Sequence, residues 1–325
     1  MCKDKNKKEN KNAYKPIYNE EKKTIYIEQR NNEIVIAKGY LHSIFGRTAP
    51  FEVKLNKDIS EFTAYEIIDM YKILNNPSLD SLIAINSVLS LYTQYCIGKG
   101  EVEDNQNHFL EITTDMMNGC VNKAVQRLRY VNFNQIKDWC KELPNVCDQF
   151  VLMGLFCGIK GKDFCELLNA TLSDFITETE FVTCTGRKIQ VPVELYNIAI
   201  EASEEEYYIA MTGNGLKQMP YKSDDTHIVK SYPNVQEGTN DFYKGRRMYN
   251  KILRIFDNLG IKDYMKASSV VESGMLEFIR VEKEKRGCDM EDLLKDAEFC
   301  KVVKQQYDKT IVPSTFVRKY GDLFV

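Results

Sequence analysis

Apolar and polar residues alternate most regularly near the N-terminus of the chain. The runs TIYIEQ (24–29) and EIVIAK (33–38) change between apolar and polar at almost every step. Between them lie Asn31 and Asn32, and asparagine tolerates the left-handed backbone that a tight turn requires. The pattern therefore predicts a β-hairpin in this stretch.

From about residue 60 the apolar positions recur every three or four residues, which is the helical period. One helix follows Ser60, a second begins at Ser78 or Asp80 and ends near Gly98, and a third begins near Thr114. These helices predict a small bundle of the kind that packs on one side of a DNA duplex. A bundle whose cations are simply solvated explains the pattern at least as well; those cations are Lys123, Arg127 and Arg129.

A second domain is predicted to begin near residues 131–134. It opens with a helix over NQIKDWCKEL (134–143), followed by Pro144 and an apolar helix over residues 145–158. Short strands come next: two strand-like runs lie around a turn at Thr185-Gly186, and Pro192 closes the second run.

The rest of the chain is predicted to be helical, apart from one long loop. VELYNIAIEA (193–202) is a helix, EEEYYIAM (204–211) is a short strand or a helix edge, and residues 212–242 form a long polar loop. A loop of that length within a domain is typically functional or mobile. The remaining helices are predicted over residues 246–260, 265–287, 290–307 and 314–324.

Length and composition indicate an ordinary globular protein that is mainly α-helical with a small β-sheet. The chain has 325 residues, of which 43% are hydrophobic and 28% charged, which suffices for two domains. We expect a basic tail with the hairpin over residues 1–55, a helical domain over 56–130 and a second domain over 131–325. The formal net charge is −3, so any basic surface must be local, and a nucleic-acid partner is neither required nor excluded.

Several classes of protein are disfavoured by the rest of the composition. No apolar segment indicates secretion or reaches the length of a membrane span. The ten cysteines form no CxxC pair, which is typical of small buried side chains in a reducing cytoplasm. His42, His108 and His227 share no ligand spacing, so we expect no metal and no cofactor. The Lys-rich tail over residues 1 to about 20 contacts a polyanion or is merely solvated.

The stretch from residue 150 to 175 carries the first candidate chemistry. An apolar helix runs into Gly158, and the next turn holds two cations, Lys160 and Lys162. Basic residues held at such a break by a rigid core are well placed to meet an anion. The alternative is a buried helical hairpin with solvated lysines.

This stretch resembles the first signature of the tyrosine recombinase (phage integrase) family. That signature is an apolar helix, Gly-Leu-Arg, an acid three residues on and a Leu-x-x-x-Asp that leads to a strand. The resemblance puts Lys160 at the arginine position, Asp163 at the acid, and Ser173-Asp174 before the strand. It implies a helical core-binding (SAM-like) domain and a catalytic-type domain, which together form a C-shaped clamp around duplex DNA.

The later signatures depart from the family in their chemistry. The strand-turn lysine that protonates the leaving oxygen is replaced by Cys184, and arginine, as at Arg187, is a poor proton donor. The His-x-x-Arg signature resembles residues 269–272, with Ser269 at the histidine and Glu272 at the arginine. Tyr320 stands at the nucleophile position, and Ile311 at the histidine or tryptophan that precedes it. A phenol needs cationic neighbours to attack a phosphodiester, so the resemblance implies that catalysis is lost.

The resemblance also implies where DNA would be contacted. Lys160 faces a phosphate, and Arg187 and Lys188 lie at the turn that enters the minor groove in that family. One helix carries a basic stripe at i, i+4 and i, i+7 spacing, for which a solvated helix face is the equal alternative. The predicted DNA-binding residues are Lys160, Lys162, Arg187, Lys188, Arg246, Arg247, Lys251, Arg254, Arg318 and Lys319.

Three functions follow from these observations. The first is a non-catalytic, sequence-specific DNA-binding repressor that acts at the nucleoid in the cytoplasm. The second is a divergent but active recombinase, and the third is a protein-interaction module with a vestigial DNA clamp. Double-stranded DNA is the expected partner, with a regulatory protein or a second copy of the chain as further partners; no membrane is expected.

Overall fold

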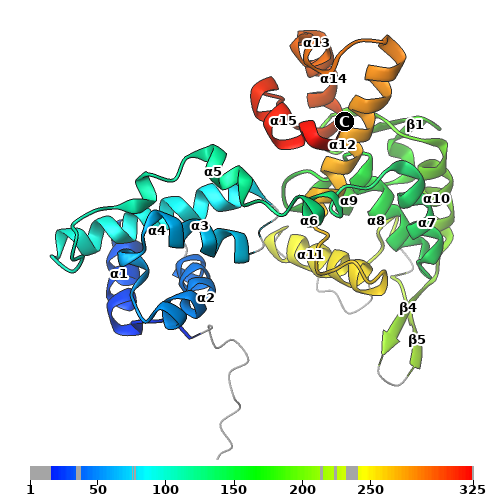
Figure 1. The fold of residues 1–325 in the computed structure, drawn as a ribbon. Helices are drawn as coiled ribbons and strands as arrows, with labels where there is room; N and C mark the ends of the chain where they lie inside the picture. The colour runs from blue at the N-terminus through cyan, green and yellow to red at the C-terminus, as the bar shows by residue number, and fades with distance from the viewer. Residues whose placement is uncertain are drawn as a thin grey trace, which may run out of the picture. The chain divides into compact units, whose positions relative to one another are not determined.

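The computed structural model divides the chain into two units, Met1–Gln126 and Arg127–Val325 (Figure 1). It describes residues 16–33, 38–74, 76, 78–212, 215–222, 225–231 and 241–323. The predicted basic tail, Lys3 to Lys11, lies outside these residues. Each unit has its own hydrophobic core. No helix within the described ranges combines the length and the apolar character needed to cross a bilayer.

Every regular element in the described part of the first unit is a helix. Its elements are α1 (Glu20–Glu33), α2 (Lys38–Leu55), η1 (Ile59–Glu61), α3 (Ala64–Ile73), α4 (Leu79–Gly98), η2 (His108–Leu110), α5 (Thr114–Gly119) and α6 (Lys123–Arg127), the last of which crosses into the second unit.

The predicted N-terminal β-hairpin is wrong, because both of its runs belong to helices, α1 and α2. In α1 the buried residues are Lys23, Tyr26 and Ile27, at helical spacing, whereas Ile25 is exposed. The alternation of apolar residues in a six-residue run fits either period, and the tertiary partners of Tyr26 and Ile27 select the helix. Residues 34–37, in the second run, lie outside the described part of the chain.

A buried ionic network joins the helices of this first core. The Lys23 ammonium contacts the Glu52 carboxylate, and both side chains are fully buried. Glu52 Oε1 also accepts from the Ile59 amide at 2.8 Å, and Asp58 Oδ2 accepts from the Tyr92 hydroxyl at 3.2 Å. Burial raises the pKa of Glu52. Because each charge has a partner, the network fixes how α1 packs against α2 and α4.

Helix starts in this unit follow local capping chemistry. The predicted cap Ser78 is confirmed, since its side chain accepts from the Ser81 amide at the start of α4. α3 begins after Thr63, later than the sequence predicted, because Thr63 and Glu66 form a reciprocal capping box. The single helix predicted from Thr114 is broken after α5, and Asn122 caps the start of α6.

The second unit is built around the apolar helix α8. Its helices are α7 (Phe133–Glu142), α8 (Val146–Phe156), η3 (Lys162–Phe164), α9 (Cys165–Leu168), η4 (Leu172–Asp174), α10 (Val193–Glu204), α11 (Asp241–Asn258), α12 (Ala267–Arg286), α13 (Met290–Lys295), α14 (Ala297–Tyr307), α15 (Pro313–Tyr320) and η5 (Gly321–Leu323). α7, α10 and α12 pack against α8 (Figure 1). A Cβ at Gly274 would lie 1.7 Å from the Phe156 carbonyl oxygen, so α12 approaches α8 this closely only with glycine there.

The strands predicted around Thr185-Gly186 are confirmed, and the first of the two predicted runs contains two strands, so that the sheet has three. β1 (Phe175–Thr177), β2 (Glu180–Val182) and β3 (Lys188–Gln190) pair antiparallel in chain order. A second sheet pairs β4 (Tyr207–Thr212) with β5 (Gly215–Pro220), so the loop predicted over residues 212–242 begins with a strand. The helix predicted over residues 290–307 is divided at Asp296, whose side chain caps α14.

Candidate nucleic-acid interface

Arg187 is a structural clamp inside the second unit. Its Nε donates to Glu166 Oε1 at 3.0 Å, Nη1 to the carbonyls of Gln305 and Gln306 at 2.9 Å each, and Nη2 to the Gly158 carbonyl at 2.8 Å and to Glu166 Oε2. These five contacts equal the five N–H donors of a guanidinium. Arg187 therefore has no donor left for the phosphate contact that the sequence predicts.

The acid that holds this region together is Glu166 rather than the predicted Asp163. Glu166 Oε2 accepts from the Lys160 amide at 2.9 Å, and Oε1 accepts from the Thr185 hydroxyl at 2.5 Å. Asp163 is exposed and has a left-handed backbone, with φ of +50°. Burial opposes the ionisation of Glu166, but the hydrogen bonds from Arg187 and Thr185 outweigh it and lower the pKa of this carboxyl.

The pKa of Glu166 predicts an acid-sensitive second unit. Because the folded-state pKa is lowered, the stabilisation is fully present above the ordinary glutamate pKa of about 4.3 and is lost as the pH falls through the lower folded value. We expect the urea midpoint of the wild type to drop more steeply between pH 5 and pH 3 than that of Glu166→Gln, in which this titration is absent. Equal slopes in the two proteins would contradict the assignment.

Lys251 is buried, although the sequence places it in an exposed basic stripe. Its Nζ lies 2.6 Å from Asp148 Oδ1 and 4.7 Å from the centre of the Tyr208 ring. Neighbouring positions on the same side of α11, Met248 and Ile252, are also buried. The desolvation cost of this lysine is outweighed by its anionic partners, which raise its pKa. Lys251 therefore holds α11 to α8 and is not an exposed phosphate contact.

Glu272 lies beside the tyrosine at the nucleophile position. Its carboxylate accepts from the Tyr130 hydroxyl at 3.3 Å and pairs with Lys319 Nζ, also at 3.3 Å. The Tyr130 ring packs edge-on against the Tyr320 ring, with centroids 5.7 Å apart. Tyr320 is only 5% exposed and contacts Phe316 as well. The ammonium of Lys319, a predicted DNA contact, is thus ion-paired with Glu272. Tyr320 is a core residue of α15.

The histidine position and the strand-turn lysine position of the recombinase signatures carry no cation. Ser269 is buried in α12, where its carbonyl accepts from the Ser273 hydroxyl at 2.7 Å. Cys184 is exposed at the strand turn, and partial burial raises the pKa of its thiol to about 11, so the thiol is neutral at pH 7. The adjacent Lys188 is 67% exposed and lies 3.6 Å from Glu180 across the strand pair.

A basic cavity of about 1060 Å³ brings several predicted residues together from distant parts of the chain. Lys162 in η3 and Arg247, Lys251 and Arg254 in α11 all line it. α11 can pack this closely on η3 because Gly245 has no Cβ. A Cβ at this position would lie only 2.8 Å from the Asp163 carbonyl oxygen. The described lining residues are Lys162, Asp163, Cys165, Leu168, Asn169, His227, Val229, Lys230, Ser231, Lys244, Arg247, Met248, Asn250, Lys251, Leu253 and Arg254.

Sequence reasoning missed two cations of this cavity. Lys244 lies one helical turn before Arg247, so its spacing could have revealed it. Lys230 falls in the stretch that was predicted to be a polar loop, where no periodicity marks it. The other predicted contacts do not line the cavity: Arg246 and Arg318 are exposed, and half-buried Lys160 has its Nζ 5.7 Å from the centre of the Phe164 ring.

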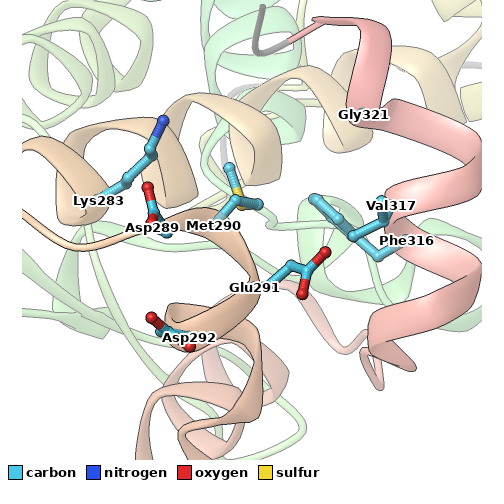
Figure 2. A pocket seen from close by; sticks show the side chains of 8 residues that line it. All are labelled: Lys283, Asp289, Met290, Glu291, Asp292, Phe316, Val317 and Gly321. Carbon is cyan, nitrogen blue, oxygen red and sulfur yellow. The ribbon is translucent and has the colours of Figure 1, made fainter.

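A smaller pocket of about 430 Å³ lies where α15 packs on α13 (Figure 2). Phe316 and Val317 of α15 form its apolar wall, and the side chain of Glu291 points toward them. Asp289 and Asp292 make the rest of the pocket acidic. Its charge is opposite to that of the large cavity, so only the large cavity suits a polyanion.

Comparison with known proteins gives the family. The family described as "MrpR, C-terminal catalytic domain" matches residues 130–316, more than half of the chain. The chain belongs to the MrpR family. The description "MrpR, N-terminal core-binding domain" matches residues 17–99, so both domain types implied by the recombinase resemblance are present. The MrpR fold is thus tyrosine recombinase-like, with a core-binding and a catalytic-type domain.

One curated relative of this MrpR family member is similar over most of its length. The chain is 22% identical over 270 residues to the "SPbeta prophage-derived uncharacterized protein YopR" of Bacillus subtilis (strain 168). The match covers 80% of this chain and 81% of the relative. A prophage protein is therefore among its relatives.

Proposed function

We propose that this protein is a sequence-specific DNA-binding protein that uses a tyrosine recombinase fold without cutting DNA. The observation that carries the proposal is the basic cavity wall, where Lys162, Arg247 and Arg254 meet although the net charge of the chain is −3. Such a local concentration of cations is what phosphate binding requires. The match to a core-binding domain supports a second DNA-contacting element.

The cluster around Glu272 supports the absence of strand cleavage. A phosphate seated at the position of the family arginine would face a carboxylate, with a repulsion of about 1 to 4 kcal/mol at a separation of about 4 Å. The lysine that neutralises Glu272, Lys319, is thereby withdrawn from the substrate. Tyr320 is buried against Tyr130, so its hydroxyl is not presented to an incoming phosphodiester.

We further propose that the protein is a prophage repressor that maintains lysogeny, like the master repressor of SPβ-like prophages. The SPβ origin of the relative supports this role, and so does a recombinase-like fold in which Glu272 stands at the position of the family arginine. Such a repressor would act at the nucleoid and bind operator sites. The repressor would also bind a regulatory protein or a second copy of the chain.

Capture of genomic fragments by the purified protein, followed by sequencing, tests this function. We expect a small set of sites in a host genome that carries the prophage, with gel-shift affinity for those sites falling steeply as salt rises. Uniform recovery of fragments, with no enriched site, would contradict sequence-specific repression. An absence of DNA binding at low salt would favour the protein-interaction module instead.

The enzyme alternative is favoured by the description of the matching family as a catalytic domain. We expect no covalent adduct when the protein meets a nicked suicide substrate built on a captured site, because Tyr320 is buried and Glu272 replaces a cation. Tyr320→Phe should bind that DNA with wild-type affinity, within about twofold. An adduct in denaturing gels that disappears in Tyr320→Phe would establish the recombinase and overturn the non-catalytic proposal.

A further inference from the structure

The basic cavity has a more apolar lining than contact with a DNA backbone requires. Its wall includes Met248, which is 2% exposed, and Val229, which is 8% exposed, together with Leu168 and Leu253. Phosphates of a rigid duplex reach exposed cations such as Arg247 and Arg254, but they leave an apolar floor empty. A volume of about 1060 Å³ is close to the upper end of the range of cavities that hold a small ligand.

Two lysines of the cavity are held in place by other parts of the second unit. Lys230 Nζ donates to the carbonyl oxygens of Ser203, at 2.5 Å, and Glu205, at 2.7 Å. An ammonium has three N–H donors, so one donor of Lys230 remains beyond these two contacts. Lys251 is fixed by Asp148. The wall thus contains two cations that other parts of the unit hold in place, in addition to exposed cations such as Lys162, Arg247 and Arg254.

Charge and polarity define the ligand. Among the described lining residues, Asp163 is the single carboxylate, against the six cations Lys162, Lys230, Lys244, Arg247, Lys251 and Arg254. The charge of Lys251 is balanced by Asp148, and the excess of the other five cations over Asp163 favours a ligand with two or more negative charges. The apolar floor requires a body without charge, and the amides of Asn169 and Asn250 can pair with polar edges of that body. A nucleoside di- or triphosphate has all three features.

We propose that this cavity binds a free nucleoside polyphosphate and that the bound nucleotide releases DNA. The first part stands on the cavity alone. The second part rests on the proposed DNA-binding function, because Arg247 and Arg254 would serve both ligands. Occupation of the cavity withdraws these two cations from the DNA phosphates and adds negative charge beside them, so binding of the two ligands is competitive.

Thermal unfolding of the full-length protein in the absence of DNA tests the site. The probes are the four ribonucleoside triphosphates and inorganic pyrophosphate, each at 1 mM. We expect at least one triphosphate to raise Tm by about 4 °C and pyrophosphate to raise it less. No shift with any triphosphate, together with no heat of binding by calorimetry, would overturn the proposal. An equal shift with pyrophosphate would reduce the cavity to a general anion site and would also overturn it.

Leu253→Trp places an indole ring in the apolar part of the cavity while keeping every cation, and Leu216→Trp, on the exposed β5 strand, is its control. We expect Leu253→Trp to lose the nucleotide-induced shift, whereas Leu216→Trp should keep that shift and bind a captured DNA site as the wild type does. A full shift in Leu253→Trp would place the nucleotide elsewhere. If this variant does not fold, photocrosslinking of the wild type with an azido-nucleotide locates the site instead. We expect the label within residues 162–169, 227–231 or 244–254, which line the cavity, and a label elsewhere would overturn the proposal.

Competition separates the two parts of the proposal. With a saturating triphosphate that binds in the assay above, we expect the affinity for a captured DNA site to fall about tenfold. Nucleotide binding with unchanged DNA affinity would keep the site and remove the regulatory role. Nucleotide binding by a protein that captures no DNA would remove the proposed function and leave the site intact.

Discussion

Replacement of Arg187 by alanine is expected to destabilise the second unit by about 3 to 5 kcal/mol, the cost of leaving a buried charge unpaired. Its partner Glu166 is 1% exposed and would lose both charge-assisted bonds. The carbonyl oxygens of Gly158, Gln305 and Gln306 would lose their donor as well. The chain has one tryptophan, Trp139, which packs on the core of this unit, so its fluorescence during urea unfolding measures the effect directly.

Lys188→Ala is the matched control for this variant. Lys188 is the next residue in the chain and carries the same charge, but it is mostly exposed, so we expect a change within about 0.5 kcal/mol. Arg187→Lys should recover only part of the stability, because an ammonium offers fewer donors in a different geometry. A normal urea midpoint for Arg187→Ala would show that the clamp does not stabilise this unit and would return Arg187 to the candidate DNA contacts.

Replacement of both Arg247 and Arg254 by alanine is expected to weaken DNA binding about 100-fold at moderate salt. Both side chains are exposed on α11 and line the basic cavity. Each neutralised phosphate contributes about 0.9 to the slope of log affinity against log salt, so the slope should become shallower by about 1.8. Gel shifts of a captured site over a series of salt concentrations measure both quantities, and stability should change little because neither arginine is buried.

Lys295→Ala combined with Lys301→Ala removes the same charge from exposed positions on α13 and α14 of the same unit. We expect this control to retain the salt slope of the wild type. If the control weakens binding as much as the α11 variant, net charge rather than the cavity wall governs affinity. An unchanged slope in the α11 variant, with binding intact, would move the DNA interface to another surface.

The helices and strands that were predicted correctly are those whose signals are local. α4 begins at its predicted serine cap, and α8 is a long apolar run that ends before Gly158, which has a φ of +90°. Glycine accepts that angle without strain, so the end of the helix is encoded at one position. The N-terminal hairpin failed because a six-residue alternation is ambiguous, and the buried network around Lys23 and Glu52 stabilises the helical choice.

The exposed part of the candidate site could be read from residue type and spacing, whereas the roles of its buried cations could not. Sequence alone predicted Lys162 at the break after α8 and the stripe on α11, because repeats of three and four residues place side chains on one helix face. It could not distinguish Arg254, which is exposed, from Lys251, which is buried against Asp148.

Only the tertiary structure decided which cations remain available to a ligand. The partners of Arg187 lie on α9, at the end of α8 and on α14, and the partner of Lys251 lies on α8. Such pairings arise when distant segments bury charge together, and a buried charge must take whichever opposite charge the fold brings to it. The sequence therefore determined which cations are present in this region. Packing determined which of them stabilise the fold as buried partners and which remain exposed to bind a ligand.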